Sequence, residues 1–210
     1  MPTTSLTARS AVKRQSILSA GQHLFLEHGY RGTSMDQVAA TASVSKQTVY
    51  KHFGEKRELL FAIVTDALDD AAAAIGDRIA ALTDSTDLDA DLTDLAGDYL
   101  RAVIREPVVQ LRRLVIGEAN RLPELARLYY EHAPARTLSA LAAAFGRLHE
   151  QGVLNAPEPS LAAEHFAFLI VGRPIDQALF DGAPAVFAAV DVESYARAGV
   201  NVFLAAYRSR

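Results

Sequence analysis

Apolar residues recur at three- and four-residue intervals along most of the chain, and no segment sustains an apolar/polar alternation. This spacing is typical of amphipathic helices, whereas alternation would have indicated strands. We therefore predict an all-α protein with about nine helices. The predicted helices cover residues 10–28, 34–41, 45–52, 55–81, 92–105, 108–119, 124–151, 160–180 and 191–207.

Glycine, proline and polar runs separate these helices. Gly29 and Gly54 end the first and third, and Ser34 with Gln37 has the capping-box spacing that opens the second. The Asp-rich run at residues 83–93 is expected to be a loop. Pro174 lies inside the predicted helix 160–180 and should kink or split it, because proline removes a backbone donor.

Composition narrows the possible classes of protein. The 210 residues include no cysteine, which excludes disulfides, thiolate catalysis and zinc sites with sulfur ligands. No apolar run approaches the roughly 20 residues of a membrane span, and the polar N-terminal stretch does not have the apolar core of a signal peptide. We expect a cytoplasmic protein without a membrane partner.

Charge is distributed unevenly along the chain. The whole sequence has a net charge of −4, but residues 1–57 carry +5 and residues 58–210 carry −9. A solvated surface could show this difference by chance. It also fits a basic N-terminal head, residues 1–56, on an acidic body, residues 57–210, and we predict these two domains.

Residues 34–53, SMDQVAATASVSKQTVYKHF, have the pattern of a helix-turn-helix. Ala39 supplies the small side chain over which a second helix can cross, and Ser43 lies at the expected tight turn. Apolar side chains at Val38, Val44 and Val49 would lock the two helices at a steep angle.

The second helix of this pair presents a polar face that contains cations and hydrogen-bond donors but no acid. Its residues are Ser45, Lys46, Gln47, Thr48, Lys51 and His52. Lysine and hydroxyl groups suit phosphates, and glutamine or lysine suits base edges in the major groove. The alternative is a solvated helical hairpin with no ligand.

Segment 17–64 resembles the N-terminal domain of the TetR family of bacterial transcription regulators. The matching elements are F-x-x-x-G-Y-x-G-T-S at Phe25–Ser34, the V-A-x-x-A-x-V-S run, and T-V-Y-x-H-F-x-x-K-x-x-L at Thr48–Leu59. Farther on, GEANRLPELARLYYEHAP, EQGVL and AAEHF resemble one group of ligand-binding domains in this family.

The resemblance implies roles for individual residues of the head. Phosphates would be bound by Thr33, Ser34, Tyr50 and Lys56, and the major groove would be read by Ser45, Lys46, Gln47 and Thr48, flanked by Lys51 and His52. Helix N-termini with free N–H groups support the phosphate roles. Tyr50 could also be a core aromatic with its hydroxyl exposed, which is compatible with phosphate binding. His52 could pack against the first helix.

The resemblance also implies a homodimer on a pseudo-palindromic operator, with a four-helix interface. Two apolar stripes at helical spacing are the candidate surfaces, unless they are only internal core. The predicted interface residues are Leu161, His165, Phe168, Gly172, Ile175, Leu179, Tyr195, Gly199 and Phe203.

An effector pocket is expected between the helices of the body, and a small hydrophobic molecule would suit it. The candidate lining residues are Tyr99, Leu114, Glu118, Tyr129, Phe145, His149, Phe166 and Arg173. Each aromatic residue among them could equally be ordinary core.

The motifs of an enzyme or a metal protein are absent from the sequence. His149 and Glu150 are not followed by the second histidine of a zinc motif, and the Asp87–Asp91 run lacks the glycine of a calcium loop. We therefore expect no catalysis, no metal and no cofactor. The predicted function is a ligand-responsive transcriptional regulator that binds double-stranded DNA, a repressor released by its effector. The alternative is a protein-interaction module with an inactive head.

Overall fold

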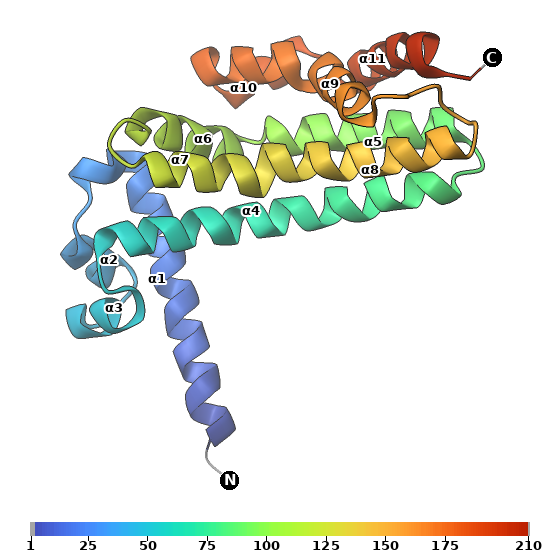
Figure 1. Ribbon diagram of the computed structural model, residues 1–210. Helices are drawn as coiled ribbons and strands as arrows, with labels where there is room; N and C mark the ends of the chain where they lie inside the picture. Colours follow the sequence, from blue (N-terminus) through green and yellow to red (C-terminus); the bar gives the residue numbers. More distant parts are fainter. Residues whose placement is uncertain (1–2, 210) are drawn as a thin grey trace. The chain divides into compact units, whose positions relative to one another are not determined.

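The computed structural model describes the backbone of residues 3–209 and the side chains of residues 9–68 and 75–209. Across that range the chain forms eleven α-helices, one 3-10 helix and one π-helix, and no strand beyond an isolated bridge (Figure 1). The all-α prediction is confirmed. The chain divides into two compact units, Met1–Ala67 with Leu114–Ala126, and Leu68–Arg113 with Arg127–Arg210.

The first unit contains α1 (Thr3–Gly32), α2 (Met35–Thr41), α3 (Lys46–Phe53) and the start of α4 (Lys56–Ala81). Regular helix ends near Gly29, whose φ of 72° interrupts α1 where the sequence predicts a stop. The apolar positions at helical spacing along α1 are buried, among them Ile17, Leu24 and Phe25. Burial of this single apolar face therefore determines how α1 packs.

The second unit is built from the rest of α4 and the helices that follow, except for the segment Leu114–Ala126, which belongs to the first unit. A 3-10 turn (Leu82–Asp84) leads to α5 (Leu88–Val103), α6 (Glu106–Glu118) and α7 (Pro123–Tyr130). A π-helix (Glu131–Ala135) joins α7 to α8 (Arg136–Glu150). The chain ends with α9 (Pro159–Asp181), α10 (Ala183–Ala189) and α11 (Val192–Tyr207), and α9 contacts α5, α8, α10 and α11 (Figure 1).

Three fully buried phenylalanines join α8, α9 and α11 at the centre of the second unit. The rings of Phe145 and Phe166 meet edge to face with centroids 5.6 Å apart, and Phe203 lies 5.0 and 5.2 Å from them. Where α11 crosses α9, Gly199 allows a close approach, because a Cβ there would lie 2.6 Å from the Cδ1 atom of Ile170. The apolar faces of these helices thus form one continuous core.

The expected loop at residues 83–93 is wrong in part, and the predicted split of the helix at Pro174 is wrong. The Asp-rich run does not stay a loop: the side chain of Asp87 accepts from the backbone N–H of Ala90 and begins α5, with Asp89 and Asp91 in its first turn. Carboxylates are favourable at this end of the helix dipole. Pro174 does not split α9, because it lies on the buried face and the packing of that face outweighs one lost backbone hydrogen bond.

Two further differences concern element boundaries. The stretch predicted as one helix at 124–151 is α7, the π-helix and α8 in succession, and Pro134 lies inside the π segment. A proline cannot donate to the preceding turn, which favours such a local widening. The short helix α10 was not predicted, since its seven residues are too few to show a period. No helix of the described residues is long and apolar enough to cross a membrane.

Candidate nucleic-acid interface

The N-termini of α2 and α3 are capped by serine side chains. Ser34 and Gln37 form the predicted capping box: the Ser34 hydroxyl accepts from Gln37 N–H at 3.2 Å, and Gln37 Oε1 accepts from Ser34 N–H at 2.8 Å. The Ser45 hydroxyl accepts from Thr48 N–H at 3.2 Å and begins α3. Local sequence therefore determines where both helices start.

The turn between α2 and α3 has the geometry that the sequence pattern predicts. Ala39 is almost fully buried, and Val38 and Val49 are completely buried where the two helices meet. Ser43 adopts a left-handed conformation with φ 55°, and Val44 N–H donates to Ala39 C=O at 3.0 Å. Val44 itself is half-buried.

The polar residues predicted to contact DNA lie together on the outer side of α3. Ser45, Lys46, Gln47 and Lys51 are exposed, and Thr48 and His52 are half-buried. Tyr50 is 44% exposed, so it is not a core aromatic. This face offers hydroxyl, amide and ammonium donors from a single eight-residue helix.

Two predicted phosphate ligands are instead engaged within the first unit. The Thr33 hydroxyl is buried and hydrogen-bonds the carbonyl oxygens of Leu24 and Gly29, each at 3.0 Å. The Lys56 ammonium donates to the carbonyl oxygens of Tyr30 and Thr33, each at 2.8 Å. Burial, together with the charge of Arg121, lowers the pKa of Lys56. Both side chains hold the end of α1 in place, and we leave them out of the proposed DNA contacts.

The segment Leu114–Ala126 belongs to the same unit as α2 and α3. Arg57 pairs with Glu124 at 2.5 Å, and Glu118 pairs with Arg121 at 2.9 Å. Leu114 and Glu118, predicted to line an effector pocket in the body, therefore lie in the first unit. The sequence pattern did not indicate this, because the two parts of the unit are about fifty positions apart along the chain.

The other predicted effector ligands have different surroundings in the second unit. Phe145 and Phe166 belong to the aromatic core, and Arg173 is exposed on α9. Tyr129 accepts a hydrogen bond from Arg112 Nε at 3.1 Å. Burial raises the pKa of Tyr99, and the charge of Arg112 acts against it.

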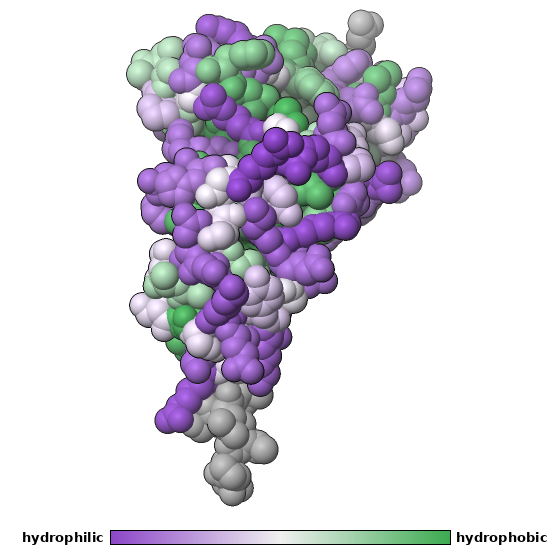
Figure 2. Space-filling model, turned by 90° about the vertical axis from the view of Figure 1, so that its left-hand side faces the viewer, coloured by the Kyte–Doolittle hydropathy of each residue, from purple (hydrophilic) through white to green (hydrophobic). Residues whose placement is uncertain are grey.

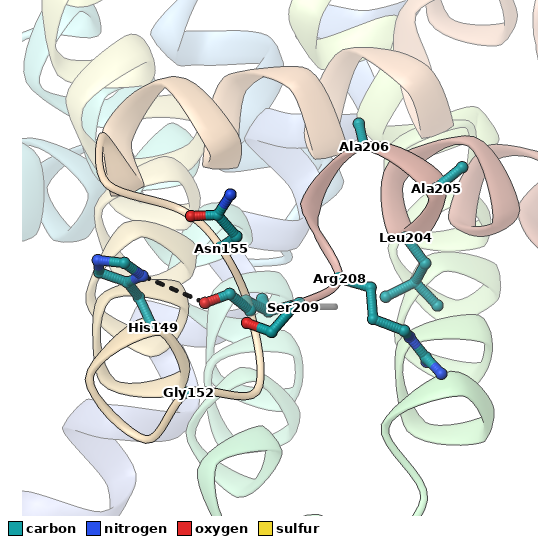
Figure 3. Close-up of a pocket in the computed structure, with 9 residues that line it drawn as sticks. His149, Gly152, Asn155, Leu204, Ala205, Ala206, Arg208 and Ser209 are labelled. Atoms are coloured by element: carbon teal, nitrogen blue, oxygen red, sulfur yellow. Dashed lines mark hydrogen bonds between the residues drawn. The ribbon is translucent and has the colours of Figure 1, made fainter.

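His149 lines a surface hollow of about 740 Å³ near the C-terminal end of α11 (Figure 3). Its Nδ1 lies 3.2 Å from the carbonyl oxygen of Leu154. Asn155, Arg208 and Ser209 add polar groups to the rim, and Arg208 also pairs with Asp89. Within the described residues no cluster of side chains could hold a metal ion.

The predicted interface residues divide between the surface and the core of the second unit. Leu161, His165 and Phe168 on α9 are exposed, Phe168 by 67%. Gly172, Ile175, Leu179 and Tyr195 are half-buried. Gly199 and Phe203 face the core, and we leave them out of the proposed interface.

Further apolar side chains that were not predicted add to the exposed surface. Phe180 on α9 is 78% exposed, Phe187 on α10 45% and Val202 on α11 57%. Figure 2 shows apolar surface at the top of the view, where Figure 1 places α9–α11.

Comparison with known proteins matches both parts of the chain. Residues 17–63 match the family model for bacterial regulatory proteins of the tetR family, and residues 90–209 match the model for the C-terminal domain of AefR-like transcriptional repressors. The HTH-type transcriptional regulator YezE of Bacillus subtilis strain 168 is 26% identical over 70% of this chain and 75% of its own. The HTH-type transcriptional activator FasR of Mycolicibacterium smegmatis is 32% identical, over 35% of this chain and 33% of its own.

A crystal structure of a TetR-family transcriptional regulator from Mesorhizobium loti MAFF303099 superimposes with a TM-score of 0.88. It is 34% identical and covers 95% of this chain and 98% of that one. The flavonoid-responsive regulator FrrA superimposes with a TM-score of 0.73 at 29% identity, over 94% of this chain and 98% of its own. These families and relatives are transcriptional regulators rather than enzymes, and the chain belongs to the TetR family of DNA-binding transcription regulators.

Proposed function

We propose that this regulator is a homodimeric, ligand-responsive repressor that binds a pseudo-palindromic operator through α3. The observation that carries the proposal is the exposed face of α3, where Ser45, Lys46, Gln47 and Lys51 stand on a helix anchored by buried Val49 and Phe53. A rigidly held helix with such donors fits the major groove, where amide and ammonium groups distinguish base pairs.

Charge supports DNA as the partner. The net charge of +5 on residues 1–57 contrasts with −9 on the rest of the chain, so the phosphate backbone would attract the end that carries α3. Ser34 and Tyr50 are exposed and remain proposed phosphate contacts. We keep residue 56 as the proposed end of the DNA-binding domain, with regulation and dimerisation assigned to residues 57–210.

A dimer is proposed because half-sites about 34–36 Å apart require two recognition helices at a fixed spacing. The exposed apolar side chains of α9–α11, above all Phe168 and Phe180, would be buried by a second copy. In a two-fold symmetric dimer, the same self-complementary patch of each subunit forms the interface. Binding would occur in the cytoplasm and occlude the promoter.

The proposed effector is a small hydrophobic molecule bound by the body. The likeness to a flavonoid-responsive regulator favours such an effector, and the match to AefR-like repressors favours repression. Because one conformational equilibrium would serve both ligands, the effector must weaken DNA binding by the same factor by which DNA weakens effector binding.

The test is a fluorescence-anisotropy titration of the purified protein against DNA that flanks its own gene, with random DNA as competitor. We expect specific binding that weakens steeply as salt rises. Lys46→Ala with Gln47→Ala should reduce operator affinity at least about 30-fold, since each good base contact contributes about 1–3 kcal/mol. Arg147→Ala with Gln151→Ala, which removes the same kinds of groups from exposed positions of the body, is the matched control.

Wild-type affinity in the Lys46/Gln47 variant would remove both residues as readers. Salt-insensitive binding, or no preference over random DNA for any genomic fragment, would favour the protein-interaction module instead. In vitro transcription from the bound promoter decides the sign of regulation: loss of transcript supports a repressor, and gain of transcript an activator.

A further inference from the structure

Lys46, the first residue of α3, is already paired with an acid of α2. Its ammonium lies 2.8 Å from Oδ1 and 3.0 Å from Oδ2 of Asp36, and both side chains are about 60% exposed. The two residues are ten positions apart, and the sequence pattern of α3 alone shows no acid on this face. Among the described residues, this is the ion pair that involves the predicted reading face.

The pair has a local physical reason. A lysine at the start of a helix faces the positive end of the helix dipole, which is unfavourable, and a nearby carboxylate compensates for it. Asp36 lies in the first turn of α2, where its charge is itself favourable. The hydrogen bond to Asp36, together with the charge of that carboxylate, raises the pKa of Lys46.

Pairing changes what Lys46 can offer to DNA. An ammonium has three N–H donors, and the carboxylate of Asp36 takes one of them, with Oδ2 3.0 Å and Oδ1 2.8 Å from Nζ. The two remaining donors stay available to base-edge acceptors, but the pair as a whole carries no net charge. A phosphate is attracted only weakly to a neutral ion pair, whereas the O6 or N7 atom of guanine needs only an N–H donor from Lys46.

Building on the proposed function, we infer that Asp36 is a specificity-determining residue that holds Lys46 as a reader of bases rather than a neutraliser of phosphates. Asp36 takes the place that a phosphate would otherwise occupy on the ammonium. Random DNA then loses one backbone contact, and an operator with the right acceptor keeps its contact.

The experiment is a double-mutant cycle on the full chain with Asp36→Asn, Lys46→Met and the double variant. Affinity for operator DNA and for random DNA of equal length is measured by anisotropy over a series of salt concentrations. Asp36→Asn should bind random DNA roughly fivefold more tightly, the effect expected of one exposed ion pair. Its plot of log affinity against log salt should steepen by about 0.9, equivalent to one added phosphate contact.

Operator affinity should rise less than random-DNA affinity, so the ratio of the two falls. In the Lys46→Met background the same Asp36→Asn change should have no effect on the salt slope. Glu27→Gln, which removes one exposed acid of α1, controls for net charge and should leave the specificity ratio unchanged. Asp36→Ser repeats the test with another residue favoured at a helix start, and thermal unfolding verifies that each variant is folded.

An equal gain from Asp36→Asn with and without Lys46 would overturn the inference, because Asp36 would then act only as a repulsive charge. An unchanged slope and unchanged specificity ratio in Asp36→Asn would also overturn it. Failure of the wild type to prefer any operator would overturn the proposed function instead. The random-DNA arm of the cycle still decides the role of Asp36 in that case, since it needs no operator.

Discussion

Ser43 holds the turn between α2 and α3 in a left-handed conformation that glycine adopts more readily. Its φ is 55°, and it is the one residue other than glycine with a positive φ among those described. A residue with a Cβ is less stable than glycine in this conformation by roughly 1–2 kcal/mol. Glycine offsets part of that advantage, because it loses more chain entropy on folding. The turn therefore stores a small strain next to the proposed reading helix.

Ser43→Gly should raise the free energy of unfolding by about 0.5–1 kcal/mol, because it removes this strain at an exposed position. Chemical denaturation monitored by circular dichroism measures the change. Ser19→Gly, at an exposed helical position of α1, is the control and should destabilise by about 0.5 kcal/mol. A loss of stability in Ser43→Gly would show that the serine side chain contributes to the turn.

At the scale of single elements, α11 has one buried face and one exposed face. Phe203 is fully buried among aromatic rings of α8 and α9, and its ring also stacks on Tyr207 at 4.8 Å. Two residues earlier, Asn201 is exposed. The helix is therefore held by its inner face, and that face determines how α9 and α11 cross.

Phe203→Ala should lower the free energy of unfolding by about 3–5 kcal/mol, since it leaves a cavity where three helices meet. Asn201→Ala on the same helix should change it by less than about 0.5 kcal/mol. Urea unfolding of both variants gives the comparison. A small effect of Phe203→Ala would mean that the aromatic core can collapse around the cavity.

At the scale of the whole molecule, the proposed dimer depends on a surface that a single chain leaves uncovered. Phe168, Phe180 and Val202 expose more than half of their side chains in the second unit. Isolated exposed apolar residues are common, but a set of them on neighbouring helices marks an interaction surface. A second copy of the chain is the proposed occupant.

Phe168→Glu should produce a folded monomer, because a carboxylate at the centre of an apolar interface would be buried without a partner. Operator affinity should then fall by about 100-fold or more, as the second half-site no longer binds intramolecularly. Sedimentation and anisotropy measure the two effects. Ile116→Glu, at an exposed position of the first unit, is the control and should remain dimeric. A dimeric Phe168→Glu would place the interface elsewhere.

Local signals explain why much of the secondary structure of this protein could be predicted from its sequence. The Ser34–Gln37 capping box, the stop at Gly29 and the buried stripe of α1 depend on neighbours within one or two turns, so the sequence alone determined them. The same holds for the polar face of α3, whose exposure follows from the period of a helix anchored by Val49.

Contacts between distant segments were decided only by the tertiary structure. The pairing of Lys46 with Asp36, the use of Lys56 to hold the end of α1, and the placement of Phe203 inside the core all depend on how helices cross. An apolar stripe shows that a helix has a face to bury but does not show against what. The sequence thus determined most of the elements and the chemistry that each carries, and packing in three dimensions decided which of those groups remain free to meet a ligand.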